Sequence, residues 1–259
     1  MANGRLATFL GQSETGIPMS NLQTLKFFVT PDHDCSYIEK ATAKTLFVDP
    51  QAPLDKPTYS QLTQYGFRRS GTHVYRPHCD GCAACISARI PVDRFKRSKS
   101  QRRIWNKNQD ILVETVEPRF DAEIYDLYAR YINARHDDGD MYPPSQEQFI
   151  NFLVESNQNT QFHLYRDMNG ELLAVAVTDQ LVDGLSAVYS FFSPDHDQRS
   201  LGVFAVLWQM EYLKQINLPY NYLGYWVKNC KKMAYKTQYQ PIEILLDDVW
   251  VDATDDMIK

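Results

Sequence analysis

Several features that define common protein classes are missing from this chain of 259 residues. No stretch approaches the roughly 20 consecutive apolar residues that a helix needs to cross a bilayer, which excludes a helical membrane protein. No Gly-x-Ser-x-Gly turn, Walker loop or dinucleotide-binding glycine fingerprint is present, so hydrolase and dehydrogenase functions lose their main support. Residues 1–16 lack a basic start and a long apolar core. We therefore expect no secretion signal and a cytoplasmic enzyme.

The composition is that of an ordinary globular protein, with 44% hydrophobic and 23% charged residues. Disorder, collagen and coiled coil are excluded by it. At roughly 150 residues per domain the length favours two domains, which we place at residues 1–117 and 118–259. We expect the acidic end, residues 247–259, to be a solvated tail.

Hydrophobic periodicity separates the two parts. The first part predicts short strands, a helix at 58–65 and a basic helix at 98–108. The second part predicts helices near 124–132 and 145–156, then three strands, two of them following Asn-Gly and Asp-Gly turns. A helix, a strand at 220–226 and a short helix at 230–239 follow. This order predicts an α+β fold.

Charge is distributed unevenly along the chain. The net charge is −5, yet residues 68–107 contain eleven Lys and Arg against two acids. A basic block in an otherwise acidic chain indicates a local site for a polyanion, although a solvated charged face would have the same composition. Within it, residues 94–107 hold seven basic residues with Phe95 and Trp105 between them. Basic side chains contact phosphates and aromatic rings stack on bases, so this segment predicts nucleic-acid binding.

The sharpest local motif is a cysteine cluster, Cys79-x-x-Cys82-x-x-Cys85, with Cys35 upstream as a fourth thiol. Such spacing brings thiolates around one metal, and four thiolates suit zinc or an iron–sulfur cluster. His78 is an alternative ligand. A redox pair and simply reduced, buried thiols are the remaining interpretations. Cys230, which stands apart among lysines, is interpreted as a packed thiol.

A second motif is the segment Gln198–Phe204, which follows a predicted strand and opens a helix. Backbone N–H groups at a helix start favour an anion, so Arg199 and Gly202 are candidates for binding phosphate. A plain helix cap would have the same pattern.

Several strings together resemble a known family. Residues 66–71 (GFRRSG), Tyr75-Arg76-Pro77, the cysteine motif and the basic helix at 98–103 resemble the N-terminal region of aminoacyl-tRNA–protein transferases. Residues 181–207 and 223–245 resemble the C-terminal half of the same family. The match runs from Cys35 to Trp250 and is most similar to the bacterial leucyltransferase branch.

The resemblance implies an enzyme that moves leucine from leucyl-tRNA to the α-amine of proteins beginning with Asp or Glu, marking them for degradation. It also implies an N-acetyltransferase-like C-terminal half with a mixed sheet and helices, packed with the N-terminal cysteine region. No organic cofactor is expected, and zinc or an iron–sulfur cluster would lie on Cys35, Cys79, Cys82 and Cys85. Orientation of two bound substrates provides much of the acceleration in such acyl transfers, so the lack of a catalytic triad is consistent with this chemistry.

Site residues follow from the same resemblance. We expect the acceptor's acidic N-terminus to be bound by Arg69, Ser70, Tyr75 and Arg76, because guanidinium groups pair with carboxylates; Arg68 and Arg69 binding tRNA phosphate is the alternative. Lys232, Tyr235 and Lys236 share one face of an α-helix and are the candidate catalytic groups. The candidate tRNA-binding residues are Arg97, Lys99, Arg102, Arg103, Arg199 and Gly202.

Three other functions compete with this one. Arginine as donor would need an acidic pocket, and Asp179 and Asp183 keep that alternative open. A non-catalytic RNA-binding metal module would explain only the basic helix and the cysteines. An acetyl-CoA-dependent N-acetyltransferase would require the turn at 198–204 to bind pyrophosphate.

Overall fold

The computed structural model describes residues 22–139, 141–228 and 230–258. The predicted absence of a secretion signal concerns residues 1–16, which lie outside the described part. Mixed helices and sheets confirm the predicted α+β class. No helix among the described residues is both long and apolar enough to cross a membrane.

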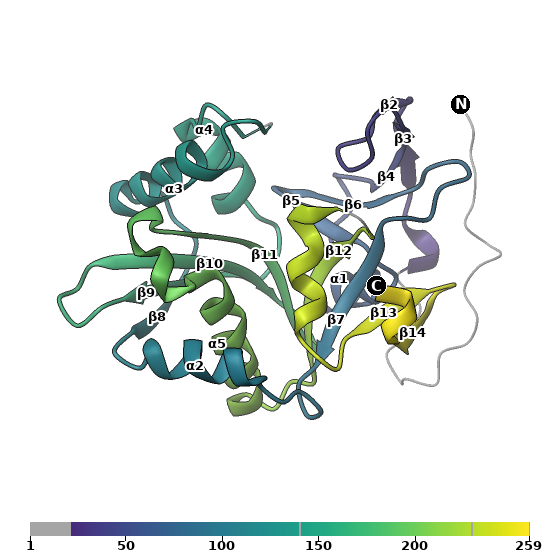
Figure 1. Cartoon of the computed structure of the whole chain (residues 1–259). Helices are drawn as coiled ribbons and strands as arrows, with labels where there is room; N and C mark the ends of the chain where they lie inside the picture. The colour runs from purple at the N-terminus through teal and green to yellow at the C-terminus, as the bar shows by residue number, and fades with distance from the viewer. Residues whose placement is uncertain (1–21, 140, 229, 259) are drawn as a thin grey trace.

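A small antiparallel sheet and a larger mixed sheet lie side by side (Figure 1). The small sheet has the order β1-β4-β6-β5 and contains Phe27–Val29, Thr45–Val48, His73–Pro77 and Arg68–Ser70. Helix α1, Lys56–Gln64, packs against it through Tyr59 and Leu62. Asp55 caps this helix by accepting a hydrogen bond from the backbone of Thr58, as expected for an acidic N-cap. A two-stranded ribbon, β2 (His33–Asp34) with β3 (Thr42–Ala43), precedes β4.

The large sheet has eight strands in the order β14-β13-β7-β12-β11-β10-β9-β8. Only β11 and β12 are parallel to each other. The strands are Val249–Asp252, Glu243–Leu246, Ile86–Pro91, Tyr220–Trp226, Gly184–Phe192, Leu172–Gln180, Thr160–Arg166 and Leu112–Val116.

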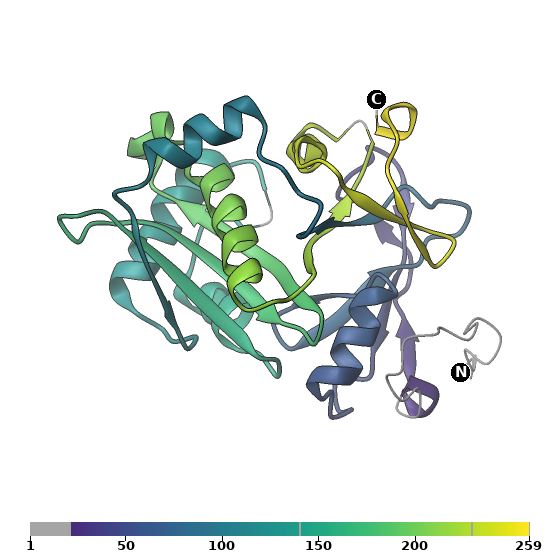
Figure 2. The ribbon, with the colours of Figure 1, turned by 90° about the horizontal axis from the view of Figure 1, so that it is seen from below.

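Helices cover both faces of the large sheet (Figure 2). Helix α5, Leu201–Gln215, packs on one face, with α2, Lys99–Lys107, against it. On the other face lie α3, Ala122–Arg135, and α4, Gln146–Phe149. The sequence predicted one helix over 145–156, but α4 continues as a π-helical stretch, Ile150–Val154. Short 3₁₀ segments lie at Leu22–Thr24 (η1), Pro194–Arg199 (η3) and Lys231–Gln238 (η4).

The strands from β8 to β12 follow one another without interruption in the large sheet. A strand and two helices precede three antiparallel strands, and α5 then returns the chain to β12, parallel to β11. The predicted boundary at residue 117 falls between β8 and α3 and stays a prediction. Strands β7 and β8, from before that boundary, belong to the large sheet.

The expectation of a solvated tail at residues 247–259 is wrong. Strand β14 pairs with β13, and α6, Asp255–Ile258, follows it. The Trp250 ring packs on Tyr222 and under the Arg89 guanidinium. Acidic residues flank this segment, but the consecutive β-branched and aromatic residues Val249, Trp250 and Val251 favour a strand.

A buried ion pair joins the two sheets. Arg69 of β5 donates two hydrogen bonds to the Asp179 carboxylate of β10, at 2.8 and 2.9 Å, and the two side chains are 1% and 0% exposed. Tyr59 of α1 and Thr160 of β9 also donate to Asp179. Every charge in this interior cluster is therefore paired and hydrogen-bonded, as buried charges require.

Replacing Asp179 with Asn should strongly destabilise the protein, because Arg69 would stay buried without a counter-charge. Breaking one partner of a buried pair costs about 3–5 kcal/mol, and urea unfolding measures the loss. Asp126→Asn removes an exposed pair with Arg130 on α3 and should cost under about 1 kcal/mol. Equal losses in the two variants would contradict the role assigned to Asp179.

Candidate functional site

Strands β11 and β12 separate in the middle of the large sheet. They pair only from Gly184 to Ser186 on β11, opposite Tyr220 to Tyr222 on β12. Both strands continue beyond that point, to Phe192 and Trp226. The opening between them is called the strand split below.

The guanidinium of Arg68, from β5, lies in the strand split. It donates to the Ser186 hydroxyl at 2.8 Å and to the backbone carbonyls of Ala187 and Tyr222. Gly224 makes room for it, because a Cβ there would come within 2.9–3.0 Å of the guanidinium atoms. Gly224 also has φ +78°, which disfavours any other residue.

Lys236 lies beside Arg68 and is 8% exposed. Its ammonium group donates to the carbonyl of Tyr225 on β12. Burial, together with the positive charge of Arg68, lowers the pKa of Lys236 to about 7. A lysine with this pKa is partly neutral at physiological pH and can accept a proton.

The three candidate catalytic residues do not share one face in the structure. They lie on η4, a 3₁₀ helix with three residues per turn, so Lys232 and Tyr235 eclipse each other while Lys236 points elsewhere. Lys232 is exposed and pairs with Asp138 at 3.2 Å. Tyr235 is 49% exposed, and only Lys236 enters the interior.

The four residues expected to bind an acidic N-terminus are dispersed. Arg69 is already paired with Asp179, and Ser70 is exposed at the end of β5. Arg76 donates to the carbonyl of Tyr65 and lies 3.8 Å from Asp248. Tyr75 stays near the strand split, with its ring 6.3 Å from that of Tyr225. Burial raises the pKa of Tyr75, and the charge of Arg68 opposes that effect.

The predicted basic helix is α2, and a capping box at Ser98 and Gln101 starts it. Its residues Lys99, Arg102 and Arg103 are exposed and form no ion pair among the described residues. Their side chains make a basic face that an RNA backbone can contact.

Two further candidates for tRNA binding are engaged inside the protein. Arg97 stacks 3.7 Å from the Trp105 ring centre and lies 2.7 Å from Glu211. Arg199 forms a two-bond pair with Asp110 at 2.9 and 2.7 Å. Gly202, in the first turn of α5, allows close packing of Phe192, whose ring would lie 2.9 Å from a Cβ.

The cysteines gather in one region. Burial raises the pKa of the Cys85 thiol to about 12, and the nearby thiols of Cys35, Cys79, Cys82 and Cys230 add to that. These residue types suit zinc or an iron–sulfur cluster. In the described ranges, however, no three His, Cys, Asp or Glu side chains are arranged so that they could hold a metal ion. The thiols lie near one another in the structure but are not arranged as a metal site.

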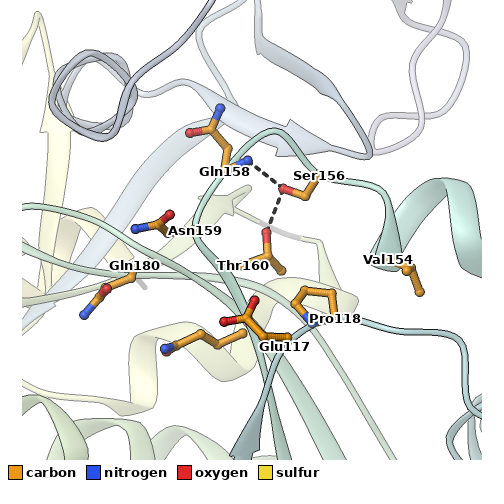
Figure 3. A pocket seen from close by; sticks show the side chains of 9 residues that line it. Glu117, Pro118, Val154, Ser156, Gln158, Asn159, Thr160 and Gln180 are labelled. Carbon is orange, nitrogen blue, oxygen red and sulfur yellow. Dashed lines mark hydrogen bonds between the residues drawn. The ribbon is translucent and has the colours of Figure 1, made fainter.

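A polar cavity of about 370 Å³ lies at the ends of β9 and β10 (Figure 3). Amide side chains dominate its lining, and Glu117 is its only charged residue. The Ser156 hydroxyl accepts a hydrogen bond from the backbone N–H of Gln158 and is hydrogen-bonded to the Thr160 hydroxyl. A site for a phosphate or an acidic peptide needs a cation, which this lining lacks. The cationic strand split is the better candidate site.

The sequence offered Arg68 only together with Arg69, as an alternative site for tRNA phosphate, and did not single out Gly224. Adjacent arginines in a strand point to opposite faces, so Arg68 and Arg69 necessarily have different surroundings. This alternation was the one sign in the sequence that the two arginines have different roles. Their partners, Ser186 for Arg68 and Asp179 for Arg69, are more than 100 positions away in the chain.

Family models match both parts of the chain. The model described as "Arginine-tRNA-protein transferase, N terminus" matches residues 33–103, and "Arginine-tRNA-protein transferase, C terminus" matches residues 123–246.

Curated relatives match almost throughout. A protein of Alcanivorax borkumensis named aspartate/glutamate leucyltransferase is 56% identical over 92% of this chain and 98% of its own length. Proteins of the same name from Marinobacter nauticus and Hahella chejuensis are 54% and 51% identical over 92% and 90% of this chain. They are covered over 100% and 99% of their lengths.

Solved structures show weaker similarity. L-PGS from Bacillus licheniformis has a TM-score of 0.48 at 13% identity, covering 73% of this chain and 60% of that one. FemX has a TM-score of 0.44 at 10% identity, covering 82% of each chain.

Proposed function

Because the chain belongs to the arginine-tRNA-protein transferase family, we propose that it transfers leucine from leucyl-tRNA to the α-amine of proteins beginning with Asp or Glu. The observation that carries this proposal is the 51–56% identity to three aspartate/glutamate leucyltransferases over at least 98% of their lengths. The product would carry an N-degron, and the reaction would take place in the cytoplasm.

The chemistry needs an oriented ester and a neutral amine. The acceptor's α-amine attacks the ester carbonyl carbon of leucyl-tRNA, the bond to the tRNA oxygen breaks, and an amide forms. An α-amine has a pKa of about 7.7–8.0, so an acceptor for its proton helps at neutral pH. Lys236, with its lowered pKa, is positioned in the interior beside the strand split to take that proton, which then passes to the departing tRNA oxygen.

Leucine is favoured over arginine as the donated residue. Asp179 and Asp183 are the two carboxylates that could have bound the side chain of a donated arginine. Asp179 forms an ion pair with Arg69, and Asp183 accepts hydrogen bonds from Tyr222 at 2.7 Å and from Gln64 at 3.0 Å. Asp179 is therefore not left to pair with an arginine side chain. Both hydrogen bonds to Asp183 end on Oδ2, and its buried Oδ1 has no hydrogen-bond partner among the described residues, so the preference for leucine rests mainly on the relatives. The assignment of zinc or an iron–sulfur cluster to Cys35, Cys79, Cys82 and Cys85 stays a prediction.

The first test is a transfer assay with labelled leucyl-tRNA or arginyl-tRNA and peptides that begin with Asp, Glu, Arg or Ala. We expect leucine to be incorporated into the Asp and Glu peptides only. Incorporation of arginine would support the same family of transferases but show that arginyl-tRNA, and not leucyl-tRNA, is the donor. Tight tRNA binding without transfer from either donor would support the RNA-binding module instead.

Transfer should depend on the protonation of Lys236. Because burial lowers the pKa of Lys236 to about 7, the group is charged below that pH and neutral above it, so kcat should rise through pH 7 and then level off. Lys236→Met should lower kcat by about 100-fold or more, the usual contribution of a general base, and remove this rise. Lys231→Met, at an exposed lysine of η4, is the control; an unchanged profile in Lys236→Met would overturn the role.

The basic face of α2 should set the affinity for tRNA. Replacing Lys99, Arg102 and Arg103 with Gln should raise the KM for leucyl-tRNA and reduce the slope of log KM against log salt by about 2 to 3, because each phosphate contact releases roughly one counterion. The KM for the peptide should not change. Arg130→Gln, on α3, removes an arginine that is paired with Asp126 and Asp195 and is the matched control. A slope equal to that of the wild type would contradict the assignment.

A further inference from the structure

Arg68 is a buried arginine that forms no ion pair with any of the described residues. The residue is 9% exposed, and the three groups to which it donates, at Ser186, Ala187 and Tyr222, are all neutral. Other buried or half-buried arginines are paired: Arg69 with Asp179 and Arg89 with Glu243. In the part of the chain that the structure describes, no carboxylate forms an ion pair with Arg68. Buried charges are normally paired, so the missing anion points to a ligand.

The surroundings of Arg68 strengthen the need for an anion. The second cation in the same enclosure is Lys236, which is also buried, and the Arg68 charge acts on it and on the hydroxyls of Tyr75 and Tyr225. The strand split thus contains two basic side chains, and among the described residues neither of them forms an ion pair with a carboxylate.

We propose that Arg68 binds the side-chain carboxylate of the acceptor's N-terminal Asp or Glu and so determines acceptor specificity. The inference rests on the proposed leucyl transfer and identifies the residue that selects its substrate. A guanidinium binds a carboxylate through charge-assisted hydrogen bonds, and the acceptor's acidic side chain brings such a carboxylate close to the reacting amine. The depth of Arg68 between two strands suits a single side chain better than an RNA backbone. Gly224, by leaving room for the guanidinium, positions Arg68.

The test compares Arg68→Gln with the wild type, using peptides that begin with Asp or with the uncharged isostere Asn. Single-turnover transfer from leucyl-tRNA gives kcat/KM for each peptide. We expect Arg68→Gln to lower the value for the Asp peptide by about 100-fold, as loss of one partner of a buried charge pair does. Because loss of the Arg68 charge would raise the pKa of Lys236, the rates are compared above pH 7, on the plateau of each variant's pH profile. There the value for the Asn peptide and the KM for leucyl-tRNA should stay within about threefold of the wild type. Arg68→Lys, which keeps the charge without the planar fork, should recover part of the preference for Asp.

Arg89→Gln is the matched control, because it also removes a buried arginine, and its ratio of Asp to Asn transfer should equal that of the wild type. Equal losses for both peptides in Arg68→Gln would overturn the inference and make Arg68 a structural residue. A higher KM for leucyl-tRNA alone would overturn it in favour of RNA phosphate. If Arg68→Gln does not fold, an Asp preference in Arg68→Lys equal to that of the wild type would overturn it. If the wild type itself transfers no leucine to Asp peptides, the proposed function fails first.

Discussion

The Arg69–Asp179 ion pair is the contact on which the arrangement of the two sheets depends. It joins β5 of the small sheet to β10 of the large one, and Tyr59 and Thr160 complete its hydrogen bonds. Because neighbouring residues of a strand point in opposite directions, fixing Arg69 on one side directs Arg68 to the other, into the strand split. The Arg69–Asp179 pair thereby fixes the position of Arg68, which forms no ion pair within the described part of the chain.

Local patterns predicted much of the fold. The Asn-Gly and Asp-Gly turns predicted the β9–β10–β11 meander, and apolar periodicity predicted α3. The turn at 198–204 indicated the start of α5. The short strands β5, β8, β13 and β14 were not predicted from the sequence, because a segment of three to five residues is too short to show a periodic pattern. Insertion of β7 between β12 and β13 joins segments more than 100 residues apart, and no local pattern encodes such pairing.

The site was predictable only in part. Residue type and spacing were enough to find the basic helix α2 and the cysteine cluster, because those features are contiguous in sequence. They could not separate Arg68 from Arg69, whose partners are contributed by distant strands. The face shared by Lys232 and Lys236 assumed α-helical geometry, and the 3₁₀ form of η4 sends these two side chains in different directions. Burial, which gives Lys236 its lowered pKa, depends on the whole fold.

The central position of β7 has a consequence for synthesis on the ribosome. Ile86–Pro91 emerges early, yet its neighbours in the sheet are residues 220–226 and 243–246. Until those segments leave the exit tunnel, a nascent chain carries a strand with two unpaired edges, the kind of surface that invites aggregation. The chain of more than 100 residues between β7 and its neighbours must first bring its ends together, and only then do the strand pairs stabilise the sheet. This requirement slows folding. The enclosure around Arg68, which needs β12, is therefore among the last parts of the molecule to form.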